Sequence, residues 1–252
     1  MSRHSLLLIL LMCYNCTFSQ EMPNYIAHAC GGINGYTYSN CKEAFLQSIE
    51  RGYSFIEVDI DTTSDGILVA SHDWESFNLN ANQPELKDKM LSLSEFRGSV
   101  IYGRYTPITI EEIVDILLEH PSVAIVTDKI SDINIIDKYF SEIKDRVYVE
   151  SFSIEDYIQL KESGYHAMYS HRIVDLCSVI IEHLLEGDAR IDFIVNSTTD
   201  DFLEIERIRC LMPFLIAMYN SNSAEFIQKH LGVDVDLIYT DFYNPTNGTF
   251  DK

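Results

Sequence analysis

The stretch FIEVDIDTTSDGILVASHDW, residues 55–74, carries the pattern that decides the fold. Its first half predicts a β-strand on which Glu57 and Asp59 lie two positions apart, and the turn sequence Ser-Asp-Gly then leads to a second short strand that delivers His72. Because side chains two apart on a strand share one face, the two carboxylates point the same way and the apolar residues around them point the other way. The stretch therefore predicts an acidic face with a histidine close to it.

Two carboxylates on one face repel each other unless a positive charge lies between them. A hard divalent cation such as Mg²⁺ or Ca²⁺ binds through oxygen ligands, and histidine, here His72, is the residue type most often used for acid–base chemistry. This chemistry favours a metal site with an acid–base group beside it. The competing interpretation is an edge strand whose acidic face is solvated, followed by a surface turn.

The N-terminal residues predict an export signal. Residues 1–19 have a basic start at Arg3, an apolar run from Leu6 to Met12 and small residues before a cleavage site at Gln20. The apolar run is far shorter than the roughly 20 residues that a bilayer requires, so we expect no transmembrane segment in the mature chain. The mature protein is expected to be periplasmic or secreted. A lipoprotein anchored through Cys16 is the less favoured alternative.

The chain is strongly acidic, with 18 basic and 39 acidic residues and a formal net charge of −21. Loss of Arg3 with the signal makes the charge of the mature chain −22, because no acid is lost with it. A surface with this charge repels nucleic acid and anionic lipid. An anionic substrate would then need a local positive centre, which a bound metal ion supplies.

The 252 residues are 46% hydrophobic, which is ample for a packed core, and strands alternate with helices along most of the chain. Eight strands are predicted, beginning at Tyr25, Phe55, Val123, Val147, Tyr165, Ile191, Phe214 and Leu237. The helices are predicted at 40–51, with Asn40 as N-cap, and at 110–120, 133–143, 154–163, 173–185, 202–210 and 224–230. This pattern predicts an α/β fold, a single-domain (β/α)8 TIM barrel over residues 20–252, with residues 75–106 as an irregular insertion or lid after the second strand.

In such barrels, the chemistry lies at the carboxyl ends of the strands. The polar residues expected at or near those ends are His28, Glu57, Asp59, Asp128 and Lys129, and the hairpin brings His72 to the same end. A solvated acidic face gives no reason for such clustering, so the barrel prediction favours a functional site.

The motifs resemble those of the glycerophosphodiester phosphodiesterase family. The residues that carry the resemblance are His28, Asn40, Glu57-Val58-Asp59, Thr63-Ser64-Asp65-Gly66, His72-Asp73, the segment from Pro107 to Glu112, Asp128-Lys129, Ser151-Phe152, Asn220 and Thr240-Asp241. They span nearly all of the mature chain. The chain departs from the family at Ala29 and Cys30, where the family has arginine and glycine, and the missing arginine would be expected to contact the substrate phosphate.

The resemblance implies a metal-dependent phosphodiesterase acting on a small-molecule or lipid-derived phosphodiester. Asp128 would complete the set of metal ligands with Glu57 and Asp59, and Mg²⁺ and Ca²⁺ both fit three carboxylates. His28 and His72 would serve as general acid and base, in an order that the sequence leaves open. Lys129 would bind the phosphate or pair with Asp128.

Two further hypotheses stay open at this point. A phospholipase-like barrel would use a hydroxyl of its own substrate as the nucleophile and release a cyclic phosphate. An exported binding protein would keep the barrel and lack catalysis.

Overall fold

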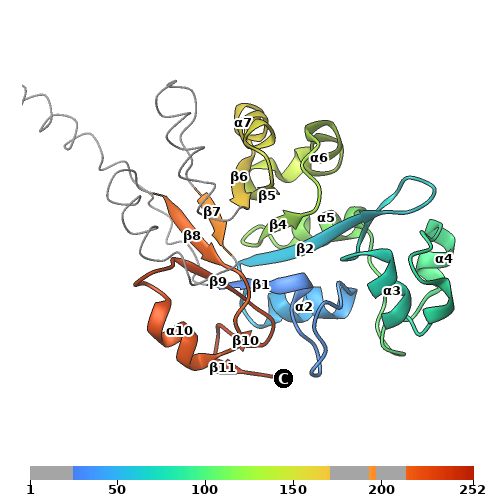
Figure 1. Ribbon diagram of the computed structural model, residues 1–252, viewed down its shortest axis with the longest axis horizontal. Coiled ribbons are helices and arrows are strands. Elements are labelled where there is room, and N and C mark those ends of the chain that lie inside the picture. The colour runs from blue at the N-terminus through green and yellow to red at the C-terminus, as the bar shows by residue number, and fades with distance from the viewer. Residues whose placement is uncertain (1–24, 171–192, 197–213) are drawn as a thin grey trace, which may run out of the picture.

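A computed structural model describes residues 25–170, 193–196 and 214–252 (Figure 1). The predicted signal peptide 1–19 and the predicted helices 173–185 and 202–210 lie outside the described residues. Among the described helices, none has the length and apolar character needed to cross a bilayer.

The described strands form a closed parallel barrel, which confirms the TIM-barrel prediction. The ring closes because the first strand pairs with both the last strand and the second one. In ring order the strands are β1 (Tyr25–Ala27), β2 (Phe55–Thr62), β4 (Ala124–Asp128), β5 (Val147–Ser151), β6 (His166–Ser170), β7 (Phe193–Asn196), β8 (Leu215–Met218) and β9 (Leu237–Thr240). Each begins within two residues of its predicted start.

The helices lie outside this ring and bury one apolar stripe each (Figure 1). In chain order they are α2 (Lys42–Glu50), α5 (Ile110–Glu119), α6 (Ile133–Phe140), α7 (Ile154–Glu162) and α10 (Ala224–His230), with short 3-10 turns at η1 (His28–Cys30) and η3 (Ser141–Arg146). In α5 the buried residues Ile110, Ile113, Val114 and Leu117 recur at helical spacing, and Thr109 begins the helix with a capping box to Glu112.

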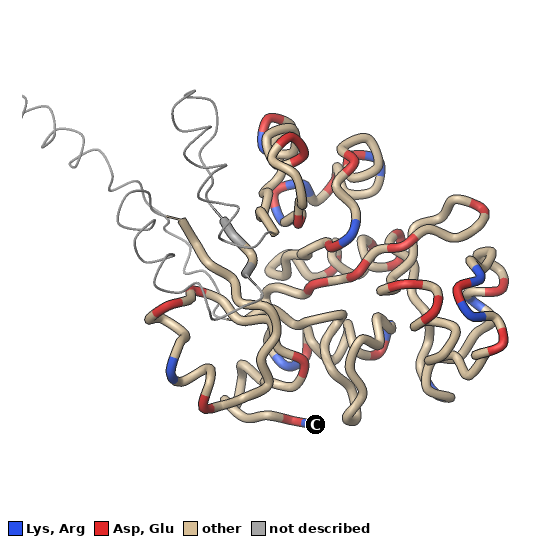
Figure 2. Tube along the Cα trace, viewed as in Figure 1, with Lys and Arg blue, Asp and Glu red and all other residues tan. Residues whose placement is uncertain are grey.

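Alternation along β2 divides its residues between two apolar cores. Phe55 lies in the cluster inside the barrel, whereas Ile56, Val58 and Ile60 lie in the cluster between the barrel and its helices. Glu57 and Asp59 continue the face of Phe55, so their carboxylates lie on the inner side of the barrel near the carboxyl end of the strand. Figure 2 shows the acidic positions recurring along β2.

Residues 75–106 are more regular than the sequence analysis predicted. After β3 (Leu68–Ala70), which pairs antiparallel with β2, the chain forms α3 (Trp74–Asn80), η2 (Pro84–Leu86) and α4 (Leu93–Gly98). The rings of Phe77 and Phe96 stack at 4.8 Å between centroids. These helices lie beyond the hairpin, away from α6 and α7 (Figure 1). A lid function for this segment stays a prediction.

The chain ends in a small hairpin below the barrel. It consists of β10 (Tyr243–Asn244) and β11 (Thr249–Phe250). The ring of Tyr243 stacks on Tyr25 of β1 at 4.0 Å, which ties the last residues to the first strand.

Candidate active site

Three carboxylates meet at the carboxyl end of the barrel. Asp59 of β2 lies directly beside Asp128 of β4 in the parallel register. Glu57 lies two residues before Asp59, on the same face of β2. One ligand atom from each acid lies within 4.8 Å of the others. Glu57 and Asp59 are 2% and 1% exposed, so the interpretation of β2 as an edge strand with a solvated acidic face is wrong.

Burial and the charges of neighbouring acids shift Glu57 and Asp128 toward their neutral forms. Burial raises the pKa of Glu57, and the charges of Asp59 and Asp128 raise it further. Burial and then Asp59 likewise raise the pKa of Asp128, partly opposed by the backbone N–H and the charge of Lys129. In the described part of the chain, no Lys or Arg forms an ion pair with any of the three acids. This set of converging oxygen donors fits a hard divalent cation.

Backbone and amide hydrogen bonds fix the two buried acids. The N–H of Ala29 donates to Oε2 of Glu57 at 2.6 Å. The amide of Asn40 donates to Oδ2 of Asp59 at 2.8 Å, and its oxygen accepts from the Asp59 N–H at 3.3 Å. Asn40 is therefore a partner of Asp59 rather than the N-cap that the sequence analysis predicted, since α2 is preceded by Cys41.

His28 lies at the end of β1 and is fully buried. Its Nδ1 lies 2.8 Å from Oδ1 of Asp241, and its Nε2 lies 2.7 Å from the hydroxyl of Tyr219. Burial alone would raise the pKa of Asp241, but the hydrogen bond and charge of His28 and the amides of Asn222 and Asn220 lower it overall. Asp241 is thus a carboxylate that accepts a hydrogen bond from Nδ1, and Nε2 of the neutral ring then accepts from Tyr219.

His72 is held in a similar way but is open to solvent. Its Nδ1 lies 2.5 Å from Oδ2 of Asp73, and its side chain is 36% exposed. Asp73 is fixed in turn because it caps α3, accepting from the N–H of Ser76 at 2.7 Å. Each of the two histidines therefore has a carboxylate partner on Nδ1, whereas the surroundings of Nε2 differ.

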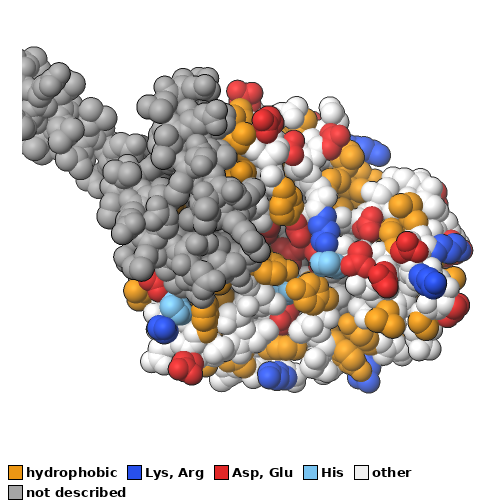
Figure 3. Space-filling view, in the orientation of Figure 1, with side chains coloured by type: hydrophobic (Ala, Val, Ile, Leu, Met, Phe, Trp, Pro, Cys, Tyr) orange, Lys and Arg blue, Asp and Glu red, His pale blue; other side chains and the backbone are white. Residues whose placement is uncertain are grey.

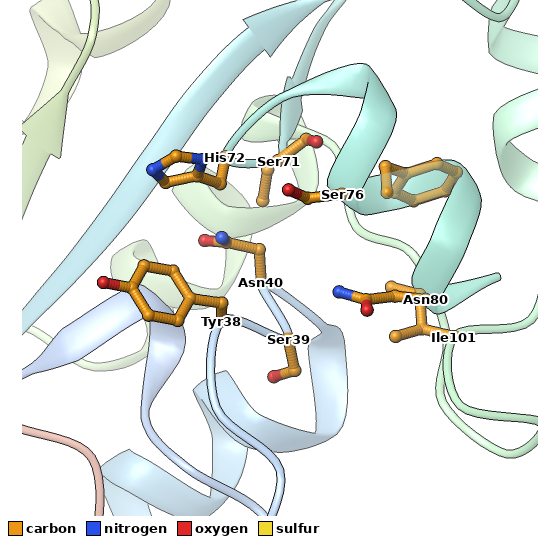
Figure 4. A pocket seen from close by; sticks show the side chains of 10 residues that line it. Tyr38, Ser39, Asn40, Ser71, His72, Ser76, Asn80 and Ile101 are labelled. Atoms are coloured by element: carbon orange, nitrogen blue, oxygen red, sulfur yellow. The ribbon is translucent and has the colours of Figure 1, made fainter. Parts of the chain in front are cut away.

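Tyr38 contacts both histidines. Its ring meets that of His28 edge-on at 4.5 Å and that of His72 edge-on at 5.4 Å. Figure 4 shows Tyr38, Asn40 and His72 around one recess, with the hydroxyl of Tyr38 and the ring of His72 directed to the same side. Tyr38 holds this place with a φ of 52°, a backbone conformation that is uncommon outside glycine.

Lys129 follows Asp128 and is exposed. Its backbone N–H donates to Oδ1 of Asp128 at 2.6 Å, and its charge partly opposes the rise in the pKa of that acid. Figure 3 shows acidic side chains set back in a hollow of this face, beside a basic side chain and a histidine. A contact between Lys129 and a substrate stays a prediction.

The structure brings all six predicted site residues to one end of the barrel, and it adds partners that had no predicted role. These are Asp241, Tyr219, Tyr38 and Asp73, which surround the histidines. Asp241 and Tyr219 directly follow strands β9 and β8, so the strand-end rule that selected Asp128 also applies to them.

The chain is similar to one known protein family. The model of the "Glycerophosphoryl diester phosphodiesterase family" matches residues 31–98, which include Asn40, Glu57, Asp59 and His72. This match confirms the resemblance noted from the sequence motifs. None of the curated proteins compared with the chain matches it.

Several solved structures share the fold. A glycerophosphoryl diester phosphodiesterase from Parabacteroides distasonis has a TM-score of 0.66 at 14% identity, over 92% of this chain and 87% of that one. A glycerophosphodiester phosphodiesterase from Thermotoga maritima has a TM-score of 0.64 at 19% identity, over 88% and 96%. An Oleispira antarctica phosphodiesterase in complex with the product sn-glycerol-3-phosphate has a TM-score of 0.65 at 16% identity, over 87% and 93%.

Proposed function

We propose that this protein is a divalent-metal-dependent phosphodiesterase that hydrolyses glycerophosphodiester-like substrates to a phosphomonoester and an alcohol. The observation that carries the proposal is the convergence of Glu57, Asp59 and Asp128 within 4.8 Å at the carboxyl end of the barrel. His28 and His72, each paired with a carboxylate, would supply the acid–base groups that hydrolysis also needs. The match of residues 31–98 to the family model supports the same reaction.

The three acids would hold the cation, which supplies positive charge for the nonbridging oxygens of a phosphodiester when bound. The binding site itself is otherwise acidic, and Lys129 is the basic residue next to it in the described chain. Oxygen donors alone suit Mg²⁺ and Ca²⁺ equally well. Lys129 would add a point charge at the exposed side of the site.

His28 and His72 would move the protons of the reaction. Hydrolysis needs one group to take a proton from the attacking water and another to give a proton to the leaving alkoxide. Both rings contact Tyr38 edge-on, and both have the Nδ1 partner that leaves Nε2 for proton transfer. A carboxylate on Nδ1 stabilises the imidazolium that forms when Nε2 takes a proton.

The substrate is proposed to be a small or lipid-derived diester of glycerol phosphate. The similar Oleispira antarctica structure holds sn-glycerol-3-phosphate, and that product has the chemistry that a cation between three carboxylates would bind. The net charge of −21 disfavours nucleic acid as the diester. The N-terminal sequence favours export, so the substrate would be met in the periplasm or outside the cell.

The test is turnover of glycerophosphodiesters by the purified protein with chelator, and after Mg²⁺ or Ca²⁺ is added back. Chelation should abolish turnover and either or both ions should restore it. Asp59→Asn should lose activity with little loss of fold, whereas Asp61→Asn, on the same strand but outside the cluster, should keep it. Full activity after exhaustive chelation would contradict the proposal.

Product analysis separates the two remaining hypotheses. An open phosphomonoester supports hydrolysis, whereas a cyclic phosphate would identify the phospholipase-like reaction. Binding of a diester without turnover would identify the binding protein.

A further inference from the structure

The catalytic nitrogen that the proposed function assigns to His28 is closed off by another residue. The side chain of His28 is 0% exposed, and its Nε2 is bonded to the hydroxyl of Tyr219 at 2.7 Å. His72, by contrast, is 36% exposed. A substrate oxygen can therefore approach His72 directly, but in this arrangement it reaches Tyr219 before it reaches His28.

The hydrogen bonds around His28 form one directed chain. When His28 is neutral and Asp241 accepts from its Nδ1, Nε2 accepts from the hydroxyl of Tyr219. The oxygen of Tyr219 lies 3.3 Å from the hydroxyl of Tyr38, which is the donor in that pair when Tyr219 donates to His28. Tyr219 is half-buried and follows β8 at the same end of the barrel as the acids. Its oxygen thus lies between Nε2 of His28 and the hydroxyl of Tyr38, which lines the recess shared with His72.

We propose that Tyr219 relays protons between His28 and the reacting oxygen of the substrate. The proposal rests on the phosphodiesterase function proposed above and adds a catalytic residue to it. It also explains why a histidine at the end of β1 can be fully buried and still take part in proton transfer.

The relay balances in both directions. When His28 is the base, the attacking oxygen gives its proton to the Tyr219 oxygen while the Tyr219 proton moves to Nε2, and the electron pair of the broken O–H bond forms the new P–O bond. When His28 is the acid, the same steps run in reverse and the proton goes to the leaving alkoxide. Tyr219 is a neutral phenol before and after either transfer.

The phenol is suited to this part because it does not need to ionise. Burial raises the pKa of Tyr219 above its usual range, and the hydrogen bond with Tyr38 and the charge of Glu57 raise it further. A free tyrosinate would therefore be a poor intermediate. A concerted relay avoids it, since the phenol gains one proton as it loses the other.

The alternative is that Tyr219 only covers His28 and must swing away before catalysis. The variant Tyr219→Phe separates the two readings because it keeps the ring and removes the hydroxyl. If Tyr219 relays protons, turnover of an alkyl diester should fall by roughly the 100- to 10,000-fold that a positioned acid or base contributes. The double variant with His28→Ala should then be no slower than His28→Ala alone. If Tyr219 is a cover, Tyr219→Phe should keep near-normal turnover.

Solvent isotope effects distinguish a proton relay from a purely structural role of Tyr219, because a structural role would not change them. A relay has two protons in flight, so a plot of the wild-type rate against the deuterium fraction of the solvent should curve below the straight line that joins its end points, whereas the plot for Tyr219→Phe should be linear. Tyr165→Phe is the matched control, because it removes a phenol that donates to Asp137 far from the site. This control should keep the wild-type rate and profile.

The outcomes also separate the two proposals. A wild-type protein that turns over no diester would defeat the proposed function and the relay together. A wild-type protein with metal-dependent turnover, and a Tyr219→Phe variant with near-normal rate, would defeat the relay alone. Melting temperature and metal affinity should stay unchanged in Tyr219→Phe, and a loss of either with the rate would assign the effect to structure and overturn the relay.

Discussion

Asn40 shows how single residues prepare the carboxylate cluster. Its amide donates to one oxygen of Asp59 and accepts from the backbone N–H of the same residue, so it fixes the acid from two sides. Asn40 has a φ of 43°, a conformation that asparagine tolerates better than most residues do. A side chain that orients a metal ligand is worth about 10- to 100-fold in metal affinity.

Asn40→Ala should therefore weaken Mg²⁺ or Ca²⁺ binding by about 10- to 100-fold, measured by isothermal titration calorimetry. Asn134→Ala, an exposed position at the start of α6, is the control and should bind as the wild-type protein does. Unchanged affinity in Asn40→Ala would show that Asp59 keeps its orientation without the amide.

The two histidines differ in their environments, and leaving-group chemistry can assign their roles. His28→Ala or His72→Ala should reduce turnover of natural diesters by roughly 100- to 10,000-fold, whereas metal binding by the acids should persist. A leaving group that needs no proton, such as p-nitrophenolate, should rescue the variant that lacks the general acid and not the one that lacks the general base. Near-normal rates in both variants would make the histidines structural.

Glu150 of β5 is a fourth acid inside the barrel and makes stability depend on pH. It is buried, and Tyr239 donates to its Oε1 at 2.5 Å. Burial and then the charge of Asp128 raise its pKa to about 8. The raised pKa means that the folded state holds a proton that the unfolded state releases, so stability is full below the unfolded pKa, near 4.5, and is lost as pH rises toward 8.

Glu150→Gln should thus stabilise the metal-free protein most at pH 8 and progressively less toward pH 4.5, because glutamine stays neutral and its oxygen can still accept from Tyr239. The measurement is the free energy of unfolding by denaturant across this range. A constant difference at all pH values would mean that Glu150 has the same pKa in the folded and the unfolded protein.

At the scale of elements, the turn after β3 links the start of a helix to the position of His72. Asp73 caps α3 through the N–H of Ser76 and also holds Nδ1 of His72. Burial opposes ionisation, but the backbone N–H of Ser76 and the hydrogen bond from His72 lower the pKa of Asp73 overall. The carboxylate of Asp73 thus caps α3 and also holds the ring of His72.

Two substitutions at Asp73 separate these roles. Asp73→Asn keeps a good N-cap but removes the charge beside His72, so stability should change little while turnover falls. Asp73→Ala should lose the cap as well and destabilise the protein by about 1 kcal/mol. Chemical denaturation and steady-state kinetics on the same samples test this. Equal stability losses in both variants would mean that the cap depends on the charge.

Elements with a clear strand or helix periodicity could be predicted from the sequence. Short helices, and contacts between residues far apart in the chain, could not. Alternation in residues 55–62 places Glu57 and Asp59 on one face of β2, and helical spacing finds α5. Helix α4 was missed although Ser92 and Glu95 form a capping box, because the helix has only 6 residues. Tyr219 and Asp241 were missed as partners of His28 because they lie 191 and 213 residues away in the chain, and no local pattern encodes such contacts.

At the scale of the whole molecule, the site is assembled by the closure of the barrel. His28 follows the first strand and Asp241 the last, and β1 pairs with β9 through three residue pairs, including Ala27 with Thr240. The backbone N–H of Gly32 also donates to the carbonyl of Asp241 at 2.7 Å. The hydrogen-bonded pair of His28 and Asp241 is therefore complete only when the first and last strands of the barrel have paired.

The acidic charge of the chain also affects the stability of the whole molecule. The chain has a net charge of −21, and three of its acids are forced together at the barrel end. A bound divalent cation should stabilise the folded state because the unfolded chain lacks this arrangement, by about 2.7 kcal/mol at a concentration 100 times the dissociation constant. The gain should grow as pH rises, since burial raises the pKa of Glu57 and Asp128 and both must lose their protons to bind the ion.

Thermal unfolding with Mg²⁺ or Ca²⁺ at a series of pH values tests this. The chain has 39 acidic residues, so diffuse binding of cations to the surface is the competing cause of any stabilisation. Sodium chloride at matched ionic strength controls for screening. Asp59→Asn controls for the site, because it leaves nearly all of the surface charge in place while removing one ligand. The metal-dependent rise in melting temperature should be lost in this variant and kept in Asp61→Asn. An equal rise in wild type and Asp59→Asn would assign the stabilisation to the surface and leave the buried carboxylates without a cation.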